Sequence, residues 1–207
     1  MAKKLRSIFP KSLAQAMPWI LIVNGAIGLI ASFVLTYDKF AILQDPKFNP
    51  NCNLDPVLSC GSVMLSEQAN AFGFPNPWIG IAAFSILITV GVAMLAGATF
   101  KRWFWLTMYV GMWLGLLFAL WLLQQSIYSI NALCPYCLAT DVAVIILVWY
   151  TTLYLIGTKM LVLRKSWKKP AAFARRHHLD ILVTIFLIII AVVLNHFWYY
   201  YGQKLSF

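Results

Sequence analysis

The stretch Pro18–Tyr37 reads PWILIVNGAIGLIASFVLTY, twenty residues without a charged side chain. Such a segment is typical of a membrane-crossing helix, because about 20 apolar residues span the hydrocarbon core of a bilayer. Further apolar segments of this kind follow along the chain. They are Trp78–Phe100, Trp103–Ile130, Leu138–Thr158 and Ile181–Tyr200. We therefore predict an all-α integral membrane protein with a bundle of five spans.

The composition of the whole chain supports this fold class. Of its 207 residues, 62% are hydrophobic and 11% are charged. A soluble domain would have about half of its residues apolar and about a quarter charged. The five spans and their connections, of which one is long, leave no room for a separate soluble domain.

The net charge of +10 could suggest a nucleic-acid partner, but its distribution argues against one. Thirteen of the sixteen lysines and arginines fall on one side of the predicted bilayer. They are Lys3, Lys4, Arg6, Lys11, Lys101, Arg102, Lys159, Arg164, Lys165, Lys168, Lys169, Arg175 and Arg176. By the positive-inside rule this side is cytoplasmic. The charge is thus a topological signal, with contacts to anionic membrane lipids as a minor addition.

This rule places the N-terminus in the cytoplasm and the C-terminus outside. The first apolar run is too long for a signal-peptide core, and no A-x-A-like cleavage site follows it, so we expect an uncleaved first span. The loop 38–77 then lies outside. Loops of this length in a compact protein are usually functional. Within it, Ser62 to Phe72 contains no proline or glycine, and we predict a short helix there on the membrane surface.

The four cysteines all fall on the predicted outer side. Cys52 and Cys60 lie in the long loop with seven residues between them, and Cys134 and Cys137 form Cys-Pro-Tyr-Cys at the start of the fourth span. In a Cys-x-x-Cys pair that opens a helix, the helix N-terminus favours the first thiolate, and such pairs exchange electrons readily. Two structural disulfides are the main alternative. A zinc site is disfavoured because the loop spacing exceeds the usual two to four residues, and we predict no metal.

Three segments together carry a resemblance to a known family. They are the loop pair in NCNLDPVLSCGS, the entry to the second span in FGFPNPWIG, and ALCPYC. With these motifs, the sequence resembles bacterial members of the vitamin K epoxide reductase family, in the five-span form of actinobacteria without a fused thioredoxin domain. The order of the pairs differs from that of the analogous four-span disulfide-bond oxidase, in which the Cys-x-x-Cys comes first.

The resemblance implies a division of the chain. Residues 1–160 would form a four-helix catalytic domain with the outer loop 38–77. Residues 161–179 would form a basic cytoplasmic loop, and residues 180–207 the fifth span and the outer C-terminus.

The resemblance also implies a role for each cysteine. Cys52 and Cys60 would be the shuttle pair, and Cys134 and Cys137 the active-site pair. A reduced DsbA-like thioredoxin-fold protein outside would attack Cys52, Cys60 would attack Cys134, and Cys137 would be released facing a lipid quinone. The actinobacterial resemblance implies menaquinone as the acceptor, in the cytoplasmic membrane of a bacterium.

Three polar residues are candidate contacts of this quinone. By the resemblance, Asn76 matches the family's pocket asparagine, and it could otherwise be a turn residue between two prolines. Ser66 falls where the family often has a serine, or it caps a helix turn. Asp141 stands where vertebrate members have a tyrosine. An ionisable group inside a span suggests a function, here as donor or proton source for the quinone, and the alternative is an interfacial Asp at a helix N-terminus.

The predicted function is a membrane thiol:quinone oxidoreductase that reoxidises the outer thioredoxin-fold partner and so supports disulfide bond formation. The main alternative within enzymes is reduction of vitamin K quinone or epoxide. Asp141, which departs from the vertebrate pattern, makes reduction of an epoxide less expected. From a different class, the alternative is a non-catalytic membrane scaffold with two structural disulfides.

Overall fold

The computed structural model describes residues 11–45, 47–162 and 164–205. Within these residues, five helices are long and apolar enough to cross a membrane. They lie in α1 (Lys11–Gln44), α3 (Pro77–Leu95), α4 (Arg102–Gln125) with the π-helical turn η3 (Ser126–Ile130), α5 (Pro135–Gly157) and α7 (His178–His196). The prediction of an all-α membrane bundle is confirmed.

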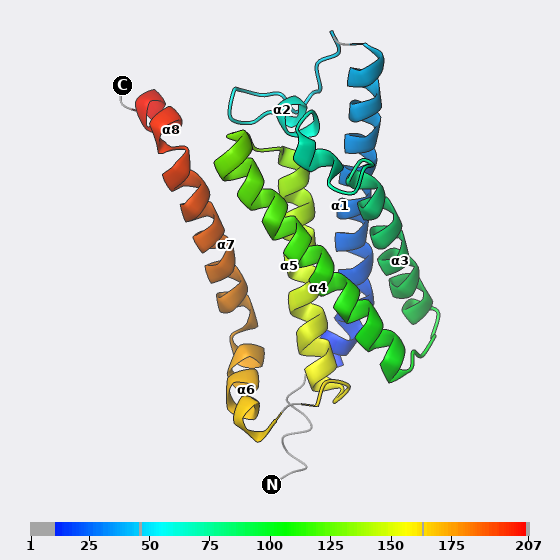
Figure 1. Cartoon of the computed structure of the whole chain (residues 1–207). Helices are drawn as coiled ribbons and strands as arrows, with labels where there is room; N and C mark the ends of the chain where they lie inside the picture. The colour runs from blue at the N-terminus through cyan, green and yellow to red at the C-terminus, as the bar shows by residue number, and fades with distance from the viewer. Residues whose placement is uncertain (1–10, 46, 163, 206–207) are drawn as a thin grey trace.

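Helices α1, α3, α4 and α5 form a four-helix bundle, and α7 stands at its edge (Figure 1). The first helix packs on both α3 and α5, and α4 packs on α5. Small residues allow the α1–α3 approach. A side chain at Gly28 would collide with the ring of Phe84, and one at Gly91 would meet the carbonyl oxygen of Pro18 at 2.8 Å. Close backbone approach at small residues is the usual way that helices pack inside a bilayer.

Helix α1 is longer than the sequence predicted. We expected a loop from residue 38, but the helix continues to Gln44, so Asp38 and Lys39 are buried helical residues. The physical reason is local, because residues 38–44 contain neither proline nor glycine to stop the helix. Pro46, one of the prolines of the predicted loop, lies outside the described residues.

The single helix predicted within Ser62–Phe72 is also wrong. The segment forms two short helices, α2 (Cys60–Met64) and the 3-10 helix η2 (Glu67–Asn70). They are separated at Ser66, whose backbone is extended and whose hydroxyl donates to the carbonyl oxygen of Val63 at 2.7 Å. A serine that binds its own preceding turn competes with the helix in this way. We call residues 60–70 the cap.

The chain turns sharply before the fourth bundle helix. Asn131 follows η3 in a left-handed conformation with φ 54°, which asparagine tolerates better than most residues. Helix α5 then begins at Pro135, three residues before the predicted start of the span, so Cys137 lies in its first turn. Proline suits this position because its missing N–H is not needed there.

The C-terminal part of the chain adds η4 (Lys165–Trp167), α6 (Lys168–Arg176), α7 and α8 (Trp198–Leu205). Helices α2 and α6 lie at opposite ends of the molecule (Figure 1), so the cysteine-bearing loop and the basic segment after α5 are also at opposite ends. Lys3, Lys4 and Arg6, which the sequence assigned to the basic side, lie outside the described residues.

Candidate active site

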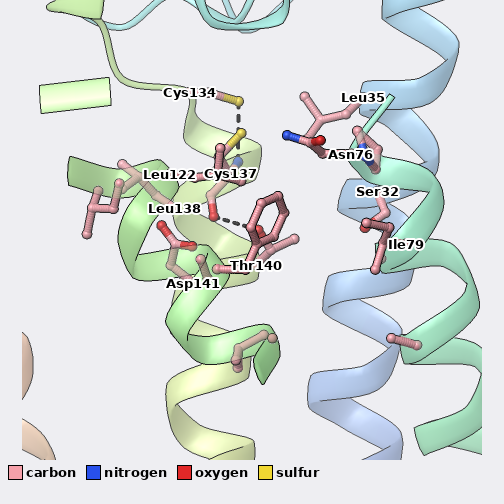
Figure 2. Close-up of a pocket in the computed structure, with 18 of the residues that line it drawn as sticks. Ser32, Leu35, Asn76, Ile79, Leu122, Cys134, Cys137, Leu138, Thr140 and Asp141 are labelled. Atoms are coloured by element: carbon pink, nitrogen blue, oxygen red, sulfur yellow. Dashed lines mark hydrogen bonds between the residues drawn. The ribbon is translucent and has the colours of Figure 1, made fainter. Parts of the chain in front are cut away.

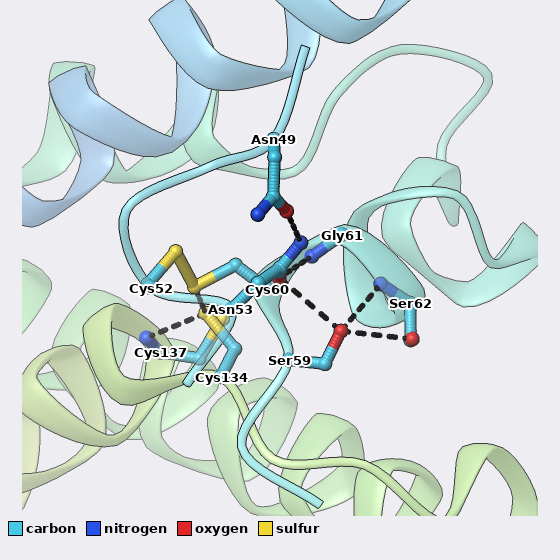
Figure 3. The surroundings of a disulfide bond; sticks show 9 residues. All are labelled: Asn49, Cys52, Asn53, Ser59, Cys60, Gly61, Ser62, Cys134 and Cys137. Carbon is cyan, nitrogen blue, oxygen red and sulfur yellow. Dashed lines mark hydrogen bonds between the residues drawn. A yellow bond between two sulfur atoms is a disulfide. The ribbon is translucent and has the colours of Figure 1, made fainter. Parts of the chain in front are cut away.

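The loop between α1 and α3 carries a closed disulfide between Cys52 and Cys60, whose Cα atoms are 5.7 Å apart. Side chains within the loop hold its shape (Figure 3). The Asn53 side-chain oxygen accepts hydrogen bonds from the Gly61 N–H at 2.9 Å and from the Ser59 hydroxyl at 3.2 Å. Ser59 also caps α2 by accepting from the Ser62 N–H. The loop therefore presents Cys60 in a defined position at the start of a helix.

A short parallel bridge joins this loop to the segment before α5. Leu58 pairs with Leu133. The Leu133 N–H donates to the Val57 carbonyl oxygen at 2.7 Å, and the Ser59 N–H donates to the Leu133 carbonyl oxygen at 2.9 Å. Cys60 follows Ser59 directly, just as Cys134 follows Leu133. The register of the bridge thus brings one cysteine of each pair to the same place.

The sulfur atoms of the two pairs are in contact. Cys134 Sγ lies 3.5 Å from Cys60 Sγ, whereas Cys134 and Cys137 are not bonded to each other (Figure 3). Cys60 and Cys134 are almost completely buried. This is the arrangement that thiol–disulfide exchange requires, with a thiol beside the disulfide that it attacks.

The Cys134 thiol has a lowered pKa. The main cause is a hydrogen bond from the Cys137 thiol, with help from the backbone N–H groups of Tyr136 and Cys137. The Cys137 N–H lies 3.3 Å from Cys134 Sγ. Burial and the negative charge of Asp141 act in the opposite direction and are outweighed. Because the thiolate is the reacting form of cysteine, this environment favours exchange at Cys134.

A cavity of about 380 Å³ lies beneath the cap, between the four helices of the bundle. This volume is within the range of small-molecule sites, and such sites are mostly apolar with a few polar groups. The polar residues that line the cavity are Ser32, Lys39, Ser66, Gln68, Asn76, Ser126, Cys134, Cys137, Thr140 and Asp141. Figure 2 shows Cys137 and Asp141 on α5 across the cavity from Asn76, Ser32 and Ile79.

The three polar candidates from the sequence all line this cavity. Asn76 is buried, and its amide stabilises the end of the cap. Its Nδ2 donates to the Gln68 carbonyl oxygen at 2.7 Å, and its Oδ1 accepts from the Ala71 N–H at 3.1 Å. Ser66 donates to Val63, as described above. Asp141 is buried, and among the described residues none donates a hydrogen bond to its carboxyl group.

A comparison with known families matches residues 19–152 to the vitamin K epoxide reductase family. The chain belongs to this family. The match runs from within α1 to within α5, so it includes both cysteine pairs and most of the four-helix bundle, while α6, α7 and α8 lie beyond it. No curated protein matches the chain significantly. Membership of the vitamin K epoxide reductase family indicates a membrane oxidoreductase.

Among the polar residues of the cavity that the sequence did not single out, Lys39 has the most telling contacts. Lys39 lies in α1, borders the cavity and is only 8% exposed. Its ammonium group donates to the Met64 carbonyl oxygen at 3.1 Å and to the Asn70 side-chain oxygen at 2.8 Å. It therefore ties both halves of the cap to α1. The continuous run of residues without proline or glycine after Tyr37 was the signal that could have placed it on a helix.

A metal centre has no support in the described part of the chain. There, no group of three or more His, Cys, Asp or Glu side chains is arranged to hold an ion.

Proposed function

We propose that the protein reoxidises an extracytoplasmic DsbA-like thioredoxin-fold protein and passes the electrons to a lipid quinone, menaquinone in our proposal. It would thereby support disulfide bond formation. The observation that carries the proposal is the 3.5 Å separation between Cys60 Sγ and Cys134 Sγ. A loop disulfide and a thiol beside the cavity are therefore within reach of exchange.

Exposure favours Cys52 as the sulfur that the partner attacks. Cys52 is 7% exposed and Cys60 is fully buried. Attack by a partner thiolate on Cys52 breaks the Cys52–Cys60 bond and leaves the electron pair on Cys60. Cys60 then attacks Cys134 in a Cys134–Cys137 disulfide, and Cys137 leaves as a thiolate.

Two further exchanges complete the transfer. The second thiol of the partner closes the partner's own disulfide and frees Cys52. Cys52 attacks Cys60, which restores the Cys52–Cys60 bond and releases Cys134. The protein is then in the state described above, with a closed Cys52–Cys60 bond and free Cys134 and Cys137. A quinone accepts two electrons and two protons, and Cys134 and Cys137 form their disulfide as they supply the electrons.

The cavity supports binding of a quinone ring next to Cys137. We assign to Asn76 a hydrogen bond to a quinone carbonyl, through the amide hydrogen that Gln68 does not accept. We assign to Asp141 the donation of a proton on the opposite side, because its buried carboxyl group has no hydrogen-bond donor among the described residues. Ser66 forms part of the wall under the cap.

The quinone tail can leave the cavity toward the lipid between α3 and α4. Both helices line the cavity, and neither Gly111 nor Gly115 of α4 has an atom within 4 Å of the place of a Cβ. Space is therefore left beside α4 for an apolar chain.

The scaffold alternative predicts two stable bridges. Against it stand the unbonded Cys134 and Cys137 and the contact of one of them with the other pair. A structural disulfide gains nothing from a neighbouring thiol, which would attack it.

Reconstitution in liposomes tests the function. The full-length protein is mixed with menaquinone and a reduced thioredoxin-fold disulfide oxidase, and quinol formation is followed by absorbance. We expect Cys134→Ala and Cys137→Ala to abolish quinol formation, and Cys137→Ala to accumulate a Cys60–Cys134 disulfide. Asp141→Asn should lower turnover by about 100-fold, the lower range for a proton-transfer group, while the exposed Asp45→Asn should not. Unchanged rates in both cysteine variants would refute the proposal.

A further inference from the structure

A separate apolar cluster surrounds the bridge between the two cysteine-bearing segments. Its buried members are Val57, Leu123, Ile127, Leu133 and Phe197. Val57 and Leu133 are joined by a backbone hydrogen bond of the bridge, and Leu123 and Ile127 belong to the end of α4 and to η3. Phe197 is the linker residue between α7 and α8. The C-terminal part of the chain thus contributes a side chain to the region that sets the sulfur contact.

The burial of Phe197 contrasts with its surroundings in the chain. Its side chain is 0% exposed, while Trp198 and Tyr199 are 60% and 58% exposed. In α7 itself, Leu182 is the one residue among those described that is buried. At the end of the bundle where the cysteines lie, the segment beyond α5 therefore packs against the bundle chiefly through Phe197 and its close neighbours.

A polar contact fixes the same junction. His196 Nε2 lies 3.1 Å from the Asn131 side-chain oxygen, and the His196 ring packs edge-on against Tyr128. Asn131 is the left-handed residue that turns the chain toward Leu133 and Cys134. The end of α7 thus contacts both the turn before Cys134 and the bridge beside Cys60.

We propose that Phe197 is a positioning residue, which clamps the Leu58–Leu133 bridge so that Cys60 and Cys134 stay in exchange distance. This role rests on the proposed exchange between the two pairs. The clamp would come from a part of the chain outside the family match, since α7 and Phe197 lie beyond residues 19–152.

The chemical step that depends on the clamp is a single exchange. The Cys60 thiolate attacks Cys134 Sγ, a Cys60–Cys134 bond forms, the Cys134–Cys137 bond breaks, and its electron pair leaves on Cys137. The attack needs the sulfur atoms aligned and in contact. Loss of the Phe197 side chain leaves a space beside Val57 and Leu133 into which the bridge can shift, carrying both cysteines with it.

The rate at which Cys60 and Cys134 form a disulfide measures the alignment of their sulfur atoms, and this assay needs neither a quinone nor a partner protein. In the full-length Cys52→Ser/Cys137→Ser protein, only Cys60 and Cys134 remain. Diamide, a small membrane-permeant oxidant that can enter the cavity lined by Cys134, oxidises them to a disulfide. Samples are quenched with acid and unfolded in detergent, the unreacted thiols are then labelled with a maleimide polymer, and the labelled species are counted on a gel. We expect Phe197→Ala to slow cross-linking by about 10- to 100-fold, because a displacement of about 1 Å can cost 100-fold in such reactions.

Three controls separate alignment from general damage. Trp198→Ala, at the exposed neighbouring aromatic, should leave the rate unchanged. Phe197→Met keeps most of the apolar volume of the phenylalanine, so this variant should retain most of the Cys60–Cys134 cross-linking rate. In the Cys134→Ser/Cys137→Ser protein, closure of Cys52–Cys60 should not respond to Phe197→Ala, because both cysteines belong to one loop.

Each outcome decides the proposal. It stands if Phe197→Ala slows the Cys60–Cys134 reaction selectively. It is overturned if that rate does not change, if Trp198→Ala slows it equally, or if Cys52–Cys60 closure slows in parallel, which would indicate a general loss of structure. A failure of the quinone assay alone would refute the proposed function and would leave this measurement valid.

Discussion

Lys39 is the residue whose replacement should affect the cavity most specifically. We expect Lys39→Met to raise the KM for quinone by about tenfold or more, with a smaller change in kcat. The reason is the loss of two hydrogen bonds from a charged donor to the cap, each contributing about 1.5–3 kcal/mol. The measurement is the quinone dependence of quinol formation in liposomes.

Lys47→Met is the matched control for this variant, since Lys47 is an exposed lysine in the loop that follows α1. It should leave the KM unchanged. Equal effects of the two substitutions would indicate that loop charge, and not the tie between the cap and α1, determines quinone binding.

A second prediction at this scale concerns pH. The pKa of Cys134 is lowered first by the hydrogen bond from the Cys137 thiol, so the Cys134 thiolate persists to lower pH than that of an ordinary cysteine. We expect the rate at which Cys134 attacks Cys60 to rise with pH through that pKa and then to level off. Cys137→Ala removes the donor and should shift the midpoint to higher pH.

Cys137→Ser keeps a hydroxyl donor at the same place. The pH midpoint of the exchange rate should therefore be lower in Cys137→Ser than in Cys137→Ala. The rate is followed by trapping Cys60–Cys134 at intervals after a jump from acid pH. Identical midpoints in the two variants would contradict the assigned cause of the lowered pKa.

Individual residues differed in how well the sequence revealed them. The cysteines could be named as candidates because their spacing and their place between spans are visible in the sequence alone. Lys39 could not be named in this way, because a lysine just beyond an apolar run is normally solvated. Its hydrogen-bond partners Met64 and Asn70 are also distant in the sequence. For Asn76, the hydrogen bonds to Gln68 and Ala71 likewise depend on how the cap folds.

Among the elements, the contact between α1 and α3 depends on glycine. We expect Gly28→Ala to lower the thermal unfolding midpoint by about 2–10 °C, because overpacking costs about 1–3 kcal/mol. An added methyl group would collide with the ring of Phe84, which also lines the cavity. The midpoint is measured in detergent by the fluorescence of a thiol-reactive dye or by light scattering.

Gly111→Ala serves as its control, since nothing lies within 4 Å of the place where the methyl group would be added. It should not lower the midpoint, and alanine is about 1 kcal/mol better than glycine within a helix. A larger loss for Gly111→Ala than for Gly28→Ala would contradict the packing described for α1 and α3.

The spans were predictable because their lengths and apolar character follow directly from the thickness of a bilayer. The residues at which the helices begin and end were less predictable. Hydropathy stopped the first span at Tyr37, although the backbone continues as a helix to Gln44. The π-helical turn before Asn131 and the division of the cap at Ser66 come from local hydrogen bonding that hydropathy does not report.

At the scale of the whole molecule, the charge distribution predicts the orientation. In a protein without its four native cysteines, Lys47→Cys should react with a membrane-impermeant maleimide in intact cells. Val162→Cys should react only after permeabilisation, because the segment after α5 lies at the opposite end from the loop (Figure 1). Both sites are exposed in the structure. The reverse pattern would place the cysteines in the cytoplasm and remove the basis for an outer partner.

The overall arrangement was also only partly visible in the sequence. The number of spans and the opposite placement of the basic segment and the cysteine loop could be derived from hydropathy and charge. That the end of α7 reaches the bridge between the cysteine segments could not, because nothing in an apolar span tells which of its residues meets protein and which meets lipid.

The unequal burial of the sulfur atoms has a consequence for the cell. Cys60 and Cys134 are 0% and 1% exposed, and the partly exposed Cys137 lines the cavity inside the bundle, so within the loop pair Cys52 is the sulfur open to a soluble thiol. The shape of the partner that fits there, and not the concentration of free thiols, would then determine how fast the quinone pool is reduced. If the cysteines face outward as proposed, the protein would then draw electrons from one partner even among many secreted proteins with open cysteines.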